Sequence, residues 1–281
     1  MRVLRCIVAL ALVVALAALV GCSNEESAEE TQLEPKISPP AILAEGVLKV
    51  GLDLSYPPFG AEVDGKEVGL DIDVAAAVAE RLGLRVELVD VGNDYVDALN
   101  EDRVDVALGA IPINEAVLAD VSFAGSYIDG GPAYFSAVET TQTIRSLGGK
   151  VVAAQQGSES FWLMNAMYGE DFAKAYPTLR EAVAAVASGE ADVVVGDAVV
   201  TAYIARDYPS VRFVQFVGEP VPYGIAVSKD ADELEAAVRE ALDGLVADGV
   251  LDAIRAKWVA AVPSQEGTVT GVATGEETGT P

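Results

Sequence analysis

Residues 101–110, EDRVDVALGA, set the pattern of the chain, because residues 188–197, SGEADVVVGD, repeat it 87 positions later. Each stretch follows a predicted helix, opens a valine-rich run with an aspartate, and carries a glycine near its end. Asp105 and Asp192 align without a gap, and so do the two glycines. Any two strand-helix units share some of these features, but the ungapped match favours two similar lobes.

Short apolar runs alternate with helical patterns between these two stretches and around them. Residues 47–52 and 84–91 are typical of strands. The stretch 69–83 between them predicts a helix, with an apolar stripe at i, i+3, i+4 and i+7 from Ala75 to Leu82. Short apolar strands between helices predict an α/β fold with sheets covered on both faces. A small ligand is then expected in a cleft between facing strand ends.

The first 21 residues predict a signal peptide. After two arginines, residues 6–20 form an uncharged run of 15 residues, which is short for a membrane span and suits a signal core. The run ends at LVGC, residues 19–22, which resembles the lipobox of bacterial lipoproteins. That resemblance implies cleavage before Cys22 and a lipid anchor on its sulfur. An ordinary signal peptide with an incidental cysteine is the alternative.

The composition favours binding over catalysis. Histidine is absent, Cys6 would leave with the signal and Cys22 would be acylated, so thiolate metal sites and His-based triads are excluded and no cofactor is expected. Removal of the signal would leave 16 basic and 44 acidic residues, a formal charge of −28. This charge disfavours nucleic acid and anionic lipid surfaces as partners. Most of the acids are expected to serve solubility, with a modest bias towards cationic ligands.

The rest of the chain divides into a core and two polar ends. Residues 22–45, rich in Glu, Ser and Pro, predict a lipid-anchored flexible tether, and residues 263–281 predict a disordered tail. Between them, we expect lobe 1 over 46–132 and 219–262, and lobe 2 over 133–218. Glycines near the two crossings are expected to absorb a hinge rotation.

Two loops offer ligand-binding side chains. In GLDLSYPPFG, residues 51–60, two prolines stiffen a loop that displays Asp53, Tyr56 and Phe59, and aromatic faces beside a carboxylate suit a cationic group. Packed aromatics with Asp53 capping a turn are the alternative. In QQGSESFW, residues 155–162, Ser158 or Ser160 is expected to cap a helix, and Glu159 either favours the helix dipole or presents a carboxylate to the cleft.

Asp197 ends a predicted buried strand, where a carboxylate either caps the next helix or holds an ammonium group. The turn from Ala110 to Val117 follows the equivalent strand in the first half. It offers Asn114 but no basic residue, and no Arg or Lys occurs between positions 104 and 144.

These segments, in this order, resemble the bacterial extracellular solute-binding proteins of family 3, the periplasmic amino-acid-binding type. The matching pieces include LKVGLDLSYPPFG, RVDVALGAIPINEAVLADVSFAGSY and SGEADVVVGDAVVTAY, and the resemblance covers residues 46 to about 260. It implies a two-lobe α/β periplasmic-binding-protein fold of type II, joined by two crossover strands. It also implies a monomer outside the cytoplasm that delivers solute to an ABC permease and ATPase complex.

The resemblance also assigns roles to residues. Tyr56 would stack on the solute with Phe59 nearby, Asp53 would face a cationic side chain, and Asp197 would take an α-ammonium. The family turn is hydroxyl-rich and ends in Thr-x-x-Arg, whose arginine clamps a carboxylate. This chain starts the turn at Ala110 and has Asn114 and Val117 at the Thr and Arg positions. In the second lobe, the hydroxyl position after QG-S is Glu159.

A pocket of this kind predicts a small polar, cationic solute, because a bound carboxylate would face acids without a counter-ion. Polyamines, guanidino compounds and quaternary amines fit. Two other functions stay open. One is a cyclohexadienyl-dehydratase-like enzyme, which would also need to grip a carboxylate. The other is a sensor module without transport.

Overall fold

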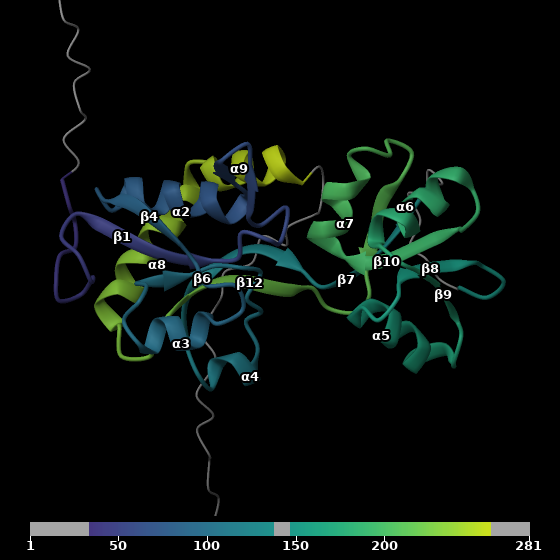
Figure 1. Cartoon of the computed structure of the whole chain (residues 1–281), viewed down its shortest axis with the longest axis horizontal. Helices are drawn as coiled ribbons and strands as arrows, with labels where there is room; N and C mark the ends of the chain where they lie inside the picture. Colours follow the sequence, from purple (N-terminus) through teal and green to yellow (C-terminus); the bar gives the residue numbers. More distant parts are fainter. Residues whose placement is uncertain (1–33, 138–146, 260–281) are drawn as a thin grey trace, which may run out of the picture. The chain divides into compact units, whose positions relative to one another are not determined.

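The computed structural model describes residues 34–137 and 147–259, which build two five-stranded sheets (Figure 1). The expected signal peptide, the lipidated Cys22 and the 263–281 tail lie outside these residues. The first sheet has the order β4-β1-β5-β12-β6; β1 runs parallel to β4 and β5, and β12 runs antiparallel to β5 and β6. Its strands are β1 (Val47–Leu52), β4 (Arg85–Asp90), β5 (Val106–Ala107), β6 (Ser122–Gly130) and β12 (Val221–Val227).

The second sheet repeats this plan, with the order β9-β8-β10-β7-β11. Here β8 runs parallel to β9 and β10, and β7 runs antiparallel to β10 and β11. Its strands are β7 (Pro132–Ser136), β8 (Val152–Gln155), β9 (Ala173–Tyr176), β10 (Val193–Asp197) and β11 (Arg212–Phe216). The α/β two-lobe fold predicted from the sequence is confirmed.

The two similar stretches, residues 101–110 and 188–197, make the same kind of hydrogen bond in the two sheets. Asp105 precedes β5, and its carboxylate accepts from the N–H groups of Lys49 and Leu43, each at 2.7 Å. Asp192 precedes β10 and accepts from the N–H of Val151, also at 2.7 Å. Lys49 and Val151 hold the same register position relative to these strands. Each aspartate therefore fixes the start of its strand against the neighbouring parallel strand.

Helices cover both faces of each sheet, as the strand composition predicts. On the first sheet, α2, α8 and α9 pack on one face, and α3 and α4 on the other; on the second, α6 and α7 oppose α5 (Figure 1). Within the described ranges, no helix has the length and apolar character needed to cross a bilayer. The helices are α2 (Leu70–Arg81), α3 (Tyr95–Asn100), α4 (Glu115–Leu118), α5 (Glu159–Tyr168), α6 (Leu179–Ser188), α7 (Ala198–Ala205), α8 (Asp232–Ala247) and α9 (Val250–Trp258).

A hairpin lies between the loop that carries Tyr56 and Phe59 and helix α2. Its strands are β2 (Ala61–Val63) and β3 (Lys66–Val68). Asp64 and Gly65 connect them, both at positive φ (52° and 72°). An Asp-Gly pair in this conformation is typical of a two-residue hairpin turn.

The chain passes between the sheets twice. It leaves β6 and enters β7 at Gly131, and it returns between β11 and β12. The expected limit of lobe 1 at residue 132 comes one residue late, because Pro132 already pairs with Asp197 in the second sheet. At Gly131, φ is +90°, and a Cβ there would lie 2.9 Å from the side chain of Val221. The crossing therefore requires glycine.

The expected flexible tether of residues 22–45 is wrong for residues 34–45. Ile37 and Ile42 are buried in the same core as β1 and α2. Two backbone N–H groups bond to the core: that of Lys36 to the carbonyl of Leu82, and that of Leu43 to Asp105. Composition indicated a solvated segment, but the two buried isoleucines and these two hydrogen bonds hold it on the core.

We expect Asp105→Ala to lower the free energy of unfolding by about 1–3 kcal/mol, because Asp105 is buried and its loss leaves the N–H groups of Lys49 and Leu43 without their acceptor. Asp192→Ala is the matched control: Asp192 is exposed and its removal leaves a donor that water can reach. Urea denaturation measures both. Equal losses at the two positions would contradict the assigned role of burial.

Candidate functional site

The loop after β1 presents a ring to solvent and buries a second ring beneath it. Tyr56 is 40% exposed and stacks on Phe59, with 5.3 Å between ring centroids and an interplanar angle of 26°. Phe59 is 1% exposed and meets the edge of Tyr223 on β12, with centroids 5.9 Å apart. The N–H groups of Phe59 and Gly60 both bond to the carbonyl of Tyr56, which closes the loop. The two prolines and these bonds hold the exposed ring in place.

Asp53 acts locally as a turn cap. Its Oδ1 accepts from the N–H of Ser55 at 2.7 Å and from the Ser55 hydroxyl at 2.6 Å. This geometry matches the alternative raised from the sequence. It leaves the other oxygen of Asp53 free of any hydrogen bond among the described residues, so the carboxylate keeps acceptor capacity.

Asp197 caps α7 and also reaches the first sheet. Its Oδ1 accepts from the N–H groups of Val199 and Val200, both at 2.9 Å. Its Oδ2 accepts from the N–H of Gly131 at 2.9 Å and from the hydroxyl of Tyr223 at 2.6 Å. One carboxylate therefore contacts β10, α7, the first crossing and β12.

The acids near Tyr56 are those whose charges affect the pKa of its hydroxyl. Burial of the hydroxyl is the first cause that raises the pKa of Tyr56, to about 12, and the charges of Asp197, Asp53 and Asp71 raise it further. The structure therefore brings four predicted site residues, Asp53, Tyr56, Phe59 and Asp197, into one neighbourhood, and adds Asp71. No ion pair of the described residues involves these three carboxylates; the salt bridges use other acids.

Asp71 is the main site residue that sequence reasoning missed. It lies in the first turn of α2 and is fully buried, and neither side-chain oxygen makes a hydrogen bond of normal geometry with the described residues. Burial raises its pKa from 3.8 to about 7, and the nearby Tyr127 hydroxyl and Ala110 N–H lower it in part. The sequence held a signal for this burial. Asp71 lies four residues before Ala75, so it continues the apolar stripe from Ala75 to Leu82 and falls on the same, buried face of the helix.

The turn after β5 has local partners and no base. Ala110 adopts a positive φ of 55°, and its N–H donates to the Tyr127 hydroxyl at 3.3 Å. Asn114 caps α4 by accepting from the N–H of Val117 at 3.0 Å. The Val117 side chain packs on the apolar cluster of α3 and β5. Val117, the residue expected at the arginine position of the family pattern, is a packed aliphatic side chain.

The second-lobe loop is less closely tied to this neighbourhood. Ser158 caps α5, accepting from the N–H of Phe161 at 3.1 Å and donating to the carbonyl of Gln155 at 2.8 Å. Glu159 is the exposed first residue of α5. No hydrogen bond or ion pair among the described residues links Glu159 to Tyr56 or the three carboxylates, so its role in binding stays a prediction.

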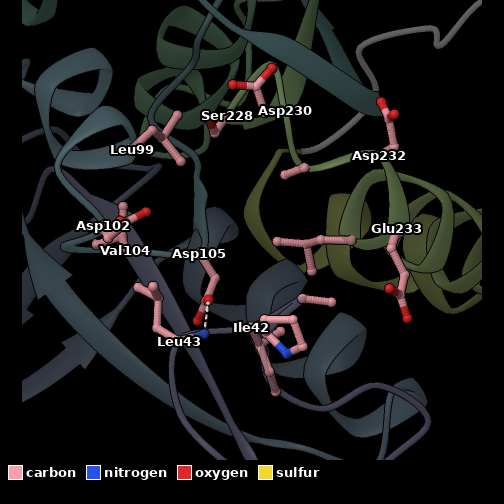
Figure 2. Close-up of a pocket in the computed structure, with 14 residues that line it drawn as sticks. Ile42, Leu43, Leu99, Asp102, Val104, Asp105, Ser228, Asp230, Asp232 and Glu233 are labelled. Atoms are coloured by element: carbon pink, nitrogen blue, oxygen red, sulfur yellow. Dashed lines mark hydrogen bonds between the residues drawn. The ribbon is translucent and has the colours of Figure 1, made fainter.

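A separate acidic cavity of about 480 Å³ lies in the first lobe, between residues 40–43, the end of α3 and the start of α8 (Figure 2). Its lining includes Asp102, Asp105, Asp230, Asp232 and Glu233, and none of the predicted ligand-binding residues. Both oxygens of Asp105 accept backbone N–H groups, so this carboxylate is structural. In the described part of the chain, no cluster of three acids, thiols or imidazoles is placed to hold a metal ion.

Comparison with known proteins agrees with this architecture. Residues 48–261 match the family model of the bacterial extracellular solute-binding proteins, family 3. The chain belongs to this family. Members are extracytoplasmic solute-binding proteins, and this chain has that general role.

Two relatives and one solved protein illustrate the family. The L-arginine-binding protein of Pseudomonas aeruginosa is 27% identical, covering 79% of this chain and 91% of the relative. The L-cystine-binding protein TcyJ of Escherichia coli is 27% identical, covering 89% and 94%. The structure of an ancestral cationic amino acid solute-binding protein, AncCDT-1, is 30% identical with a TM-score of 0.65, covering 76% and 96%. A second structure of AncCDT-1 describes it as a precursor of cyclohexadienyl dehydratase, with 29% identity, a TM-score of 0.54 and coverage of 76% and 95%.

Asp71 predicts a pH-dependent stability of known sign. A carboxyl whose folded-state pKa is raised contributes full stability below its unfolded pKa of 3.8, and this contribution is lost as the pH rises through about 7. At about 1.36 kcal/mol per pKa unit, the loss is on the order of 4 kcal/mol. Relative to wild type, Asp71→Asn is therefore expected to gain stability between pH 4 and pH 8.

Urea denaturation at both pH values measures this gain as the difference between variant and wild type. The control is Asp94→Asn, since Asp94 is exposed and makes no side-chain bond to its helix. A stability difference at Asp71 that does not change with pH would contradict the buried, unpaired carboxyl.

Proposed function

We propose that this protein is an extracytoplasmic solute-binding lipoprotein of an ABC importer, and that it captures a small cationic solute with an amine or guanidinium group. The observation that carries the proposal is the surroundings of Tyr56. Burial is the largest cause that raises the pKa of Tyr56, and the charges of Asp197, Asp53 and Asp71 raise it further, so these three carboxylates lie near the ring; no described ion pair uses them. An aromatic face next to uncompensated acids suits a cation.

The same site disfavours a carboxylate on the solute. The relatives named for L-arginine and L-cystine bind carboxylate-bearing amino acids by their names. In this chain, the position at which the family pattern has a carboxylate-binding arginine is taken to be Val117, which packs against the first-lobe core. A solute carboxylate here would add a negative charge beside Asp53 and Asp197, and none of the described ion pairs brings a base to these acids.

Capture is proposed to follow rotation of the lobes about the two crossings. A solute that touches Tyr56 on one side and Asp197 on the other binds one arrangement of the lobes better and shifts the population towards it. Gly131 is the position where the backbone most clearly requires glycine at a crossing. A closed protomer would then deliver the solute to the permease and ATPase, acting as a monomer.

We also propose that the protein is not an enzyme. The dehydratase alternative has support in the ancestral neighbour described as a precursor of that enzyme. However, its substrate carries carboxylates, and the same missing base argues against their binding here.

Agmatine and L-arginine test the charge argument, because they share the guanidinium and one amine and differ in the carboxylate. We expect agmatine to bind with a Kd at least about tenfold lower, equivalent to 1.4 kcal/mol, by isothermal titration calorimetry. Asp53→Asn should weaken agmatine binding, whereas Asp243→Asn, on the exposed face of α8, should not. Equal or tighter binding of L-arginine would refute a carboxylate-free solute.

The lipid anchor has its own test. In a bacterial host that processes lipoproteins, the wild-type chain is expected in the membrane fraction, and Cys22→Ser should move it to the soluble extracytoplasmic fraction. Cys6→Ser is the matched control and should leave the distribution unchanged. Membrane retention of the Cys22→Ser chain would mean that another element anchors it.

A further inference from the structure

The carboxylate of Asp197 has no unused acceptor position. A carboxylate offers about four lone-pair sites. Two are taken by Val199 and Val200, one by Gly131 and one by Tyr223, at distances of 2.9, 2.9, 2.9 and 2.6 Å. A solute ammonium that reaches Asp197 therefore meets an acceptor that is already saturated, and one donor has to leave.

Three of these donors are backbone groups held by their elements. The N–H groups of Val199 and Val200 belong to the first turn of α7. The N–H of Gly131 lies at the crossing, where its carbonyl accepts from Ala198 at 2.8 Å. None of them can withdraw from Asp197 without unwinding a helix or moving the crossing strand.

The fourth donor is a side-chain hydroxyl from the other sheet. The Tyr223 ring lies against Gly130, where a Cβ would come within 2.1 Å of it, and against the edge of Phe59. Its oxygen also accepts from the N–H of Gly131 at 3.1 Å, so it keeps one partner if it releases Asp197. Tyr223 therefore links the stacked rings of Tyr56 and Phe59 to the carboxylate of the second lobe.

We propose that the Tyr223 hydroxyl occupies the position on Asp197 that the solute's ammonium takes, and that it leaves this position when solute binds. The proposal rests on the proposed role of Asp197 as the ammonium acceptor. An ammonium donor makes a charge-assisted bond, which is stronger than that of a neutral phenol. Without Tyr223, the free protein would carry a partly buried carboxylate one donor short.

This exchange predicts that loss of the hydroxyl tightens binding. Tyr223→Phe keeps the ring on Gly130 and Phe59 but removes the competing donor. The Kd should fall about fivefold to a hundredfold, the range for one unsatisfied buried acceptor, and the Tm of the solute-free variant should fall. A residue that merely supports the fold would weaken binding or leave it unchanged.

The test measures the Kd of agmatine, L-arginine, L-glutamine and L-cystine by calorimetry for wild type and Tyr223→Phe. All four probes carry an amino group, so the effect of Tyr223→Phe on Kd can be measured with whichever probe binds. Preference for glutamine would contradict the proposed cationic solute without deciding the role of Tyr223. The control is Tyr134→Phe, whose hydroxyl contacts Met164 in the second lobe and should leave Kd unchanged. A higher or unchanged Kd in Tyr223→Phe, or no binding of any probe to either protein, overturns the proposal.

A second readout follows the hydroxyl itself. In the solute-free protein, the Tyr223 hydroxyl oxygen lies 2.6 Å from Oδ2 of Asp197. The proton between these two oxygens should give a slowly exchanging downfield NMR signal that Asp197→Asn abolishes. Saturation with the tightest probe should also remove it. Persistence of the signal in the saturated protein would show that Tyr223 stays on Asp197 and would contradict the exchange.

Discussion

The carboxylate of Asp197 is the point on which the rest of the structure depends. It ends the central strand β10 of the second sheet, starts α7, accepts the N–H of the first crossing and accepts the hydroxyl of Tyr223 from the first sheet. Each contact constrains a different element. A Cβ at Gly130 would clash with the Tyr223 ring and one at Gly131 with Val221, so a side chain at either position would displace the crossing or its neighbours.

The second constraint is electrostatic. Acids outnumber bases by 44 to 18 in the whole chain, but surface charge of this kind mainly serves solubility. What distinguishes the site is that Asp53, Asp71 and Asp197 all act on the ring of Tyr56. The described ion pairs place their arginines and lysines on other acids, such as Arg81 on Asp248. Family membership supplies the two lobes, and we propose that these acidic side chains restrict the solute to cations.

Much of the fold could be predicted from sequence because its signals are local. Alternating apolar runs indicated the α/β class. The repeated aspartates, Asp105 and Asp192, both accept hydrogen bonds from backbone N–H groups at the start of a strand. The loop with Tyr56 was recognisable from its prolines and rings. These features depend on periodicity, turn chemistry and spacing, and each signal, including each copy of the repeated stretch, occupies no more than ten or twenty residues.

The features that escaped prediction depend on contacts between distant residues. The packing of Ile37 and Ile42 was hidden by the polar composition around them. Tyr223 is 26 residues from Asp197, and no local pattern joins them. Asp71 continued an apolar stripe, yet a carboxylate in a first helical turn is usually a solvated residue that favours the helix dipole. Its burial beside Tyr127 follows only from the folded arrangement.

A crystal structure of the protein with agmatine bound would show directly whether solute replaces Tyr223 on Asp197. We expect a nitrogen of the solute within about 3 Å of Asp197, its aliphatic chain against Tyr56, and the Tyr223 hydroxyl withdrawn from the carboxylate. Agmatine bound elsewhere, with the Tyr223–Asp197 hydrogen bond intact, would contradict this expectation.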